Sequence, residues 1–171
     1  MQGLIQVYTG DGKGKTTAAL GLALRAAGAG LKVFIGQFLK GAEYSEIKAL
    51  RQLAPGIEIK QYGRRCFIKD KPDEEDIRLA QNGLGEMESV IQSGDYDLVI
   101  LDEANIAVYY NLFSVDELLK VVQNRPKQVE IVITGRNADP RIIAAADLVT
   151  EMREIKHYYQ KGIAARLGIE M

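Results

Sequence analysis

The sequence predicts an α/β domain of three layers, in which helices cover both faces of a mainly parallel sheet. Two observations favour this fold class. Apolar segments of strand length recur along the chain without polar alternation, and helix-like segments separate them, as expected for parallel strands buried on both faces. The length of 171 residues is that of one compact domain, so we expect a single domain over residues 1–171.

The strands are expected where the apolar segments lie, and the first helix follows the first of them. This helix begins near Lys15 and is rich in alanine, which permits close packing on the sheet, and Gly28 and Gly30 mark its end. The expected strands are residues 4–8, 32–38, 57–62, 97–101, 129–134 and, more weakly, 148–152.

Two further helices have recognisable N-termini. Residues 72–92 form one of them, and the four acids at 73–76 suit its start because the first backbone amides of a helix carry partial positive charge. We interpret these acids as a solvated helix start. Residues 114–123 form the other helix, with Ser114 as N-cap and Glu117 three residues later in a capping-box arrangement.

The composition argues against nucleic-acid and membrane partners. The formal net charge is -1 and the sequence pI is near 5.9, whereas a dedicated nucleic-acid binder usually carries a basic field. No window approaches the roughly 20 apolar residues that span a bilayer, and the N-terminus has no signal-peptide pattern. Cys66 is the only cysteine, which rules out an intrachain disulfide. We therefore expect a cytoplasmic protein.

A glycine-rich loop joins the first strand to the first helix. Residues 9–17 read TGDGKGKTT, and Gly10, Gly12 and Gly14 permit backbone angles and close approach that a side chain would obstruct. Consecutive amides can then surround phosphate oxygens, assisted by the positive end of the following helix. The usual pattern has a glycine where this chain has Thr9, so the match is imperfect. The position of the loop nevertheless predicts a P-loop nucleotide-binding site.

The residues at the end of this loop have separate expected roles. Lys15 supplies a mobile positive charge for the phosphates, and the Thr16 hydroxyl is the usual ligand of magnesium. Asp11 and Lys13 occupy the variable positions, and Thr17 completes the loop.

An acidic pair follows the apolar strand at residues 97–101. In a parallel sheet the ligand binds at the carboxyl edge, where Asp102 and Glu103 would lie. One acid can hold magnesium directly or through water, and its neighbour can orient a water or a substrate. The alternative is a pair that only caps a helix.

Six blocks taken together resemble a specific family. They are TGDGKGKTTAALG at 9–21, VFIGQFLKG at 33–41, VILDE at 99–103, ITGRNADP at 133–140, ADLVTEM at 146–152 and IKHYYQKGIAARLGIE at 155–170. In this order they resemble the corrinoid adenosyltransferases of the CobA, BtuR and CobO type, over nearly the whole chain. The resemblance implies a P-loop NTPase-like, RecA-like fold.

The resemblance also implies a reaction and its participants. The 5′-deoxyadenosyl group of ATP moves to the cobalt(I) of a reduced corrinoid and triphosphate is released, with Mg²⁺ or Mn²⁺ as the metal ion. The nucleophile is the cobalt of the substrate, so the protein needs to position both substrates and stabilise the leaving triphosphate. The implied partners are a second copy of the chain, in a homodimer, and an electron donor such as a flavoprotein reductase.

The roles of individual residues follow from the same resemblance. Lys15 stabilises the growing charge of the triphosphate, and Thr16 and Glu103 hold the metal; these three residues are the expected catalytic set. Asp102 is the expected partner of Glu103, and Arg136 is placed to meet phosphate or corrinoid, unless it only forms a surface salt bridge. The residues expected to bind the triphosphate are Gly10, Asp11, Gly12, Lys13, Gly14, Lys15, Thr16 and Thr17.

The chain departs from the family near the corrinoid. Family members often have a tryptophan after the third strand, whereas residues 62–70 read YGRRCFIKD and the chain has no tryptophan. Phe67 is therefore the candidate for an apolar group below the cobalt, with simple packing as the alternative. Arg64 and Arg65 are candidates for contacts with corrinoid or phosphate. The only histidine, His157, is not expected to bind cobalt, because a strong axial donor would oppose reduction.

Two other functions fit the residues alone. A small P-loop kinase or ATPase would use Glu103 for water or hydroxyl chemistry. A non-catalytic ATP-binding module would use the loop only to bind nucleotide. Corrinoid-dependent release of triphosphate distinguishes the adenosyltransferase from both.

Overall fold

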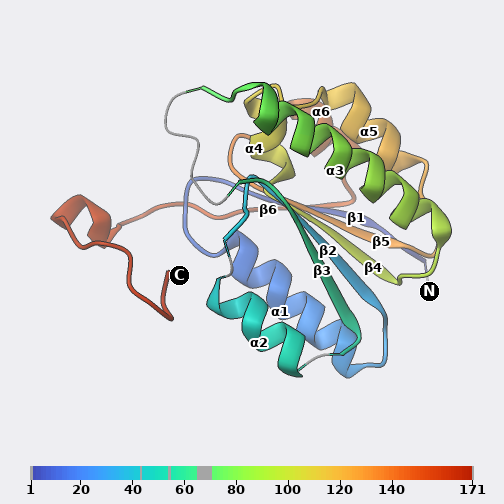
Figure 1. The fold of residues 1–171 in the computed structure, drawn as a ribbon, viewed down its shortest axis with the longest axis horizontal. Coiled ribbons are helices and arrows are strands. Elements are labelled where there is room, and N and C mark those ends of the chain that lie inside the picture. Colours follow the sequence, from blue (N-terminus) through green and yellow to red (C-terminus); the bar gives the residue numbers. More distant parts are fainter. Residues whose placement is uncertain (1, 43, 54, 65–70, 171) are drawn as a thin grey trace.

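The computed structural model describes residues 2–42, 44–53, 55–64 and 71–170, and these form a six-stranded parallel sheet covered by helices on both faces (Figure 1). The strand order is β3-β2-β4-β5-β1-β6, and every pairing is parallel. This confirms the predicted three-layer α/β class. The strands are β1 (Ile5–Thr9), β2 (Val33–Phe38), β3 (Ile57–Tyr62), β4 (Leu98–Asp102), β5 (Glu130–Thr134) and β6 (Leu148–Glu151).

The helices divide between the two faces of the sheet. Figure 1 shows α1 and α2 on one face and α3 to α6 on the other. Their bounds are α1 (Lys15–Gly28), α2 (Ser45–Leu53), α3 (Glu74–Ser93), α4 (Ala104–Tyr109), α5 (Val115–Gln123) and α6 (Pro140–Ala145), and a 3-10 turn, η1 (Tyr158–Lys161), follows β6. None of the described helices is long and apolar enough to cross a membrane.

Two hydrophobic cores explain why the strands are continuously apolar. In β4, Val99 and Leu101 pack into the core under α3 to α6, whereas Leu98 and Ile100 pack into the core under α1 and α2. Successive side chains of a strand point to opposite faces, so each strand must be apolar on both. The second core is small because the buried face of α1 consists of Ala19, Ala23 and Ala26.

The predicted helix starts are found close to where the sequence places them. Ser114 caps α5, and its hydroxyl and the Glu117 carboxylate form the reciprocal contacts of a capping box. Asp73 caps α3 in the same manner, with Asp76 as the reciprocal partner. The helices α2, α4 and α6 and the turn η1 are additions to the elements expected from the sequence.

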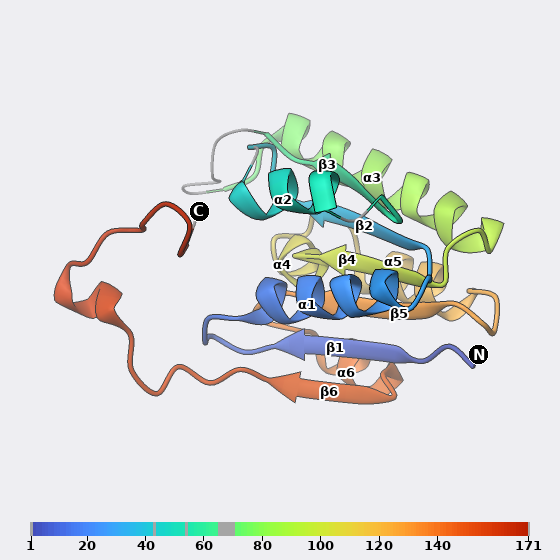
Figure 2. The same ribbon diagram turned by 90° about the horizontal axis from the view of Figure 1, so that it is seen from below.

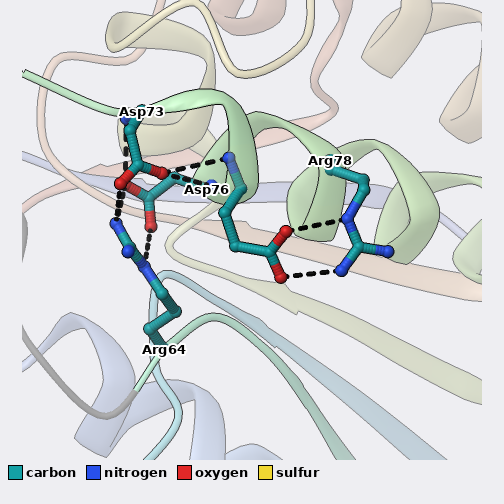
Figure 3. Close-up of polar contacts among 5 residues, drawn as sticks. Arg64, Asp73, Asp76 and Arg78 are labelled. Carbon is teal, nitrogen blue, oxygen red and sulfur yellow. Dashed lines mark hydrogen bonds and ion pairs between the residues drawn. The ribbon is translucent and has the colours of Figure 1, made fainter.

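The acidic start of α3 is not simply solvated, because it binds Arg64, which follows β3 (Figure 3). The guanidinium donates to both oxygens of Asp76 at 2.8 and 2.7 Å and to Asp73 at 2.7 Å. Asp76 is buried. Glu75 faces solvent and pairs with Arg78 one turn later. The end of β3 and the start of α3 are therefore joined by a charged, bidentate contact, and Arg64 is committed to it in this structure.

Candidate active site

The glycines of the phosphate loop are required by two separate constraints. Gly10 and Gly14 have φ values of 93° and 119°, in the left-handed region. In addition, a Cβ at Gly10 or Gly12 would lie 2.5 or 2.7 Å from the carbonyl oxygen of Met152. The Gly12 amide donates to that same oxygen at 2.7 Å. The loop is thus shaped partly by the chain that follows β6, which the phosphate motif alone does not indicate.

The Lys15 ammonium is held inside the loop. It donates to the carbonyl oxygens of Gly10 and Gly12 at 2.6 and 2.7 Å, and the residue is 8 % exposed. Burial, together with the nearby positive charge of Arg136, lowers the pKa of Lys15. The two hydrogen bonds hold the ammonium in the loop, where phosphate oxygens are expected.

Asp102 is the centre of a buried polar network at the carboxyl end of β4. The side chain is 1 % exposed, and it accepts hydrogen bonds from Thr134 at 2.6 Å, Thr16 at 2.9 Å and Gln37 at 3.0 Å. The Lys40 ammonium lies 2.8 Å away. Burial by itself would raise the pKa of Asp102, but the charge of Lys40 and these hydrogen bonds outweigh it and lower that pKa. The carboxylate is therefore ionised at neutral pH.

Glu103 differs from its neighbour in both backbone and surroundings. It has a φ of 61°, and its amide donates to the Thr134 hydroxyl at 3.0 Å. Burial and the negative charge of Asp102 raise the pKa of Glu103. Among the described residues no hydrogen bond to the Glu103 carboxylate is found, although the side chain lines a cavity. A half-buried carboxylate without a donor is suited to receive a ligand.

The cavity has a volume of about 910 Å³ and joins segments that are distant in sequence. Residues 12–17 of the phosphate loop line one side, and Glu103 and Arg136 lie at the ends of β4 and β5. Gly10 and Asp11 belong to the same loop but do not line the cavity, and Asp102 lies behind the residues that do. Phe67 lies outside the described residues. The structure thus brings together Lys15, Thr16, Glu103 and Arg136, as the sequence predicts.

The backbone is strained where the strands end at this cavity. Leu39, Glu103 and Asn137 have φ values of 61°, 61° and 54° and follow β2, β4 and β5, respectively. Non-glycine residues adopt such angles only where the surrounding structure enforces them, and functional sites are enriched in them. The neighbours of Leu39 and Asn137 are Lys40 and Arg136, and both line the cavity.

The C-terminal segment forms another wall of the cavity. Residues 152–170 extend from the carboxyl edge of the sheet, shown in red in Figures 1 and 2. Lys13 of the phosphate loop donates to Glu170 at 2.9 Å and to the carbonyl oxygen of Ile169 at 3.0 Å. His157 also lines the cavity, and its Nδ1 accepts from the Tyr159 amide at 3.0 Å at the start of η1. That contact gives His157 a structural role at the start of η1.

Lys40 is the main residue that the sequence analysis did not assign. It belongs to the block at 33–41, but no role was deduced for it. Lys40 lies two residues after a buried strand. Because the carboxyl ends of parallel strands share one edge, this position marks it as a candidate for the site but does not reveal its contact with Asp102.

The oxygen atoms in the site are a partial ligand set for a hard divalent cation. The Thr16 hydroxyl, Glu103 and Asp102 are ligands of the kind that Mg²⁺ prefers, and Mg²⁺ commonly takes its remaining ligands from substrate phosphates and water. No group of three or more His, Cys, Asp or Glu able to hold a metal occurs among the described residues. The oxygen donors of Thr16 and Glu103 fit a metal that would take further ligands from a bound nucleotide.

Comparisons with known proteins agree with this geometry. The family model for ATP:corrinoid adenosyltransferase BtuR/CobO/CobP matches residues 1–171. The corrinoid adenosyltransferase of Pseudomonas aeruginosa is 36% identical over 170 residues, covering 99% of this chain and 84% of the relative. The corrinoid adenosyltransferase of Escherichia coli K12 is 35% identical and the corrinoid adenosyltransferase CobA of Salmonella typhimurium 34% identical, each over 99% of this chain and 86% of the relative.

Proposed function

The chain belongs to the ATP:corrinoid adenosyltransferase family BtuR/CobO/CobP, and from this membership we propose how its cavity carries out the reaction. Its activity is the transfer of the adenosyl group of ATP to a corrinoid. The kinase, ATPase and non-catalytic alternatives are not favoured. The observation that supports our proposal most directly is that the phosphate loop and the Glu103 carboxylate face one cavity.

We propose that the triphosphate of ATP binds at residues 10–17. The cobalt(I) electron pair of the reduced corrinoid forms a bond to C5′ of the ribose, the bond from C5′ to the triphosphate oxygen breaks, and its electron pair leaves with the triphosphate. The loop amides, Lys15 and Arg136 stabilise the negative charge that develops on this leaving group. Holding C5′ and the corrinoid in line supplies the rest of the catalysis.

We propose that Thr16 and Glu103 hold Mg²⁺ or Mn²⁺ together with phosphate oxygens. The metal, when bound, supplies positive charge to the triphosphate. Asp102 keeps the Thr16 side chain in place through the hydrogen bond at 2.9 Å. Because the oxygens of Asp102 already accept hydrogen bonds from surrounding donors, Asp102 orients Thr16 and is not itself a metal ligand. The half-buried Glu103 is the carboxylate that would hold the metal.

Further parts of the proposal concern the substrate and the partners. We propose cob(I)yrinic acid a,c-diamide and cob(I)alamin as corrinoid substrates, with a flavoprotein reductase as the source of electrons. We also propose that residues 1–171 act as one domain, that the enzyme is a cytoplasmic homodimer, and that Phe67 packs below the cobalt.

An anaerobic assay tests the reaction. Chemically reduced cobalamin, ATP and Mg²⁺ are mixed with the enzyme, the cobalt(I) absorbance is followed, and the phosphate product is identified. Adenosylcobalamin and intact triphosphate are expected in equal amounts. Formation of ADP or orthophosphate without cobalt chemistry would contradict the proposed reaction.

A further inference from the structure

Lys40 contacts both the proposed metal ligand Thr16 and Asp102, the carboxylate that lies behind it. Its ammonium lies 2.8 Å from Asp102 Oδ2 and 3.4 Å from Thr16 Oγ1. The side chain is 16 % exposed and lines the cavity. A positive charge therefore already lies beside the hydroxyl that a divalent cation would use.

The turn that carries Lys40 is fixed by its neighbours. Leu39 has a φ of 61° directly after β2. A Cβ at Gly63 would lie 2.5 Å from the Lys40 amide nitrogen, and a Cβ at Gly41 would lie 2.3 Å from the Gly63 carbonyl oxygen. The turn after β2 and the end of β3 are therefore in close backbone contact, which directs Lys40 toward Asp102 and not toward solvent.

Three negative groups surround Lys40, from two parts of the fold. Asp102 and Glu103 lie at the end of β4, and Glu46 lies in α2. The Tyr44 ring centroid is 5.9 Å from the ammonium. These groups hold the ammonium of the flexible Lys40 side chain at the edge of the cavity.

We propose that Lys40 is a positioning residue that takes the place of the divalent cation in the nucleotide-free site. It keeps Asp102 paired and Thr16 oriented, and its charge opposes entry of a free divalent cation a few ångströms away. When the triphosphate binds, the Lys40 ammonium turns from Asp102 to the phosphate oxygens, and Thr16 and Glu103 would then be able to hold a metal ion together with the nucleotide. This inference rests on the proposed function, since it assumes the metal site at Thr16 and Glu103.

Binding of free Mn²⁺ to the nucleotide-free protein tests the inference, with electron paramagnetic resonance to count the unbound ion. Lys40→Gln keeps a hydrogen-bond donor and removes the charge, so it should bind Mn²⁺ at least about tenfold more tightly than the wild type, a gain of about 1.4 kcal/mol. Lys40→Arg keeps the charge and should bind as weakly as the wild type. Lys48→Gln, at an exposed position of α2, is the matched control and should change nothing.

Equal Mn²⁺ affinity of Lys40→Gln and the wild type would overturn the inference and leave Lys40 as a structural counterion of Asp102. If Lys40→Gln lowers Tm, Mn²⁺ without nucleotide should restore Tm in that variant and leave the wild type unchanged. A Tm that does not respond to Mn²⁺ in either protein would also overturn it. Failure of the proposed function is distinguishable, because it appears as a wild type that forms no adenosylcobalamin in the anaerobic assay, whatever the Mn²⁺ affinities of the two proteins without nucleotide.

Discussion

Replacing Asp102 by asparagine tests whether this buried carboxylate organises the site. The amide has the shape of the carboxylate but only one oxygen. The Lys40 ammonium and the Gln37 amide nitrogen cannot act as acceptors, so the amide oxygen must face them. The amide nitrogen then faces Thr16 and Thr134, whose hydroxyls must stop donating and accept instead. Lys40 also loses its counterion.

The expected loss of stability can be worked out from these contacts. Removing one partner of a buried ion pair costs about 3–5 kcal/mol. Lys40 is 16 % exposed, so water offsets part of this loss and the lower value of about 3 kcal/mol applies. For a domain of this length, each kcal/mol changes Tm by about 2–4 °C, so Asp102→Asn should lower Tm by about 6–12 °C. Turnover should also fall, because Thr16 loses the acceptor that orients it.

Thermal unfolding followed by circular dichroism measures this effect. The control is Asp116→Asn, because Asp116 is 80 % exposed and pairs with Arg141 at 2.9 Å on the surface. Surface ion pairs of this kind contribute about 0–1 kcal/mol, so the control should change Tm little. A Tm for Asp102→Asn as high as that of the control would refute the reasoning.

The same comparison depends on pH in a defined direction. Because the pKa of Asp102 is lowered in the folded protein, the ionised carboxylate adds stability that is fully present above the ordinary value of 3.8. That stability is lost as the pH falls through the native pKa. The Tm of the wild type should therefore exceed that of Asp102→Asn by the largest amount at neutral pH, and this difference should become smaller below pH 3.8.

Three further predictions concern the proposed site. Lys15→Ala should abolish most turnover and leave the fold intact by circular dichroism; near-normal turnover would remove Lys15 from the catalytic set. Glu103→Gln should also lose turnover, but its Tm at pH 8 should be higher than that of the wild type, because the raised pKa of Glu103 means that folding disfavours the ionised carboxylate. This gain in Tm should vanish below pH 4.5, the ordinary pKa of a glutamate. Equal Tm values for the variant and the wild type at pH 8 would contradict the prediction. Phe67→Ala should reduce adenosylation more when cobalt(II) is reduced on the enzyme than when cobalt(I) is supplied chemically, and equal losses in the two assays would reject its role at the cobalt.

The sequence predicts the sheet well because the strands are buried on both faces. Their apolar runs match the observed bounds to within one residue. The helices were harder to find. The six-residue helices α4 and α6 are shorter than the window in which a period of 3.6 can be recognised. The capped helices α3 and α5 were found because their acids and Ser114 mark a start independently of periodicity.

The parts of the candidate site that lie in a sequence motif could be predicted. The contacts that depend on the order of the strands in the sheet could not. Residues 10–17 form a continuous motif, and Glu103 follows a recognisable strand. Lys40 and Asp102, by contrast, meet because β2 lies beside β4, with Gln37 opposite Asp102 in register. Strand order cannot be read from the apolar runs, so this contact stays hidden in the sequence. The left-handed backbone at Leu39 is equally hidden, since leucine is not a residue that signals positive φ.

Three lysines around the phosphate loop have acceptors within the protein. Lys13 pairs with Glu170, Lys15 donates to loop carbonyls, and Lys40 pairs with Asp102. A triphosphate must therefore exchange these contacts for its own, so its affinity is the difference between the new contacts and the ones that are lost. Two of the three positive charges are already neutralised by carboxylates, which leaves little net charge for a highly anionic leaving group. A divalent cation would supply the missing charge, and this is the physical reason to propose one at Thr16.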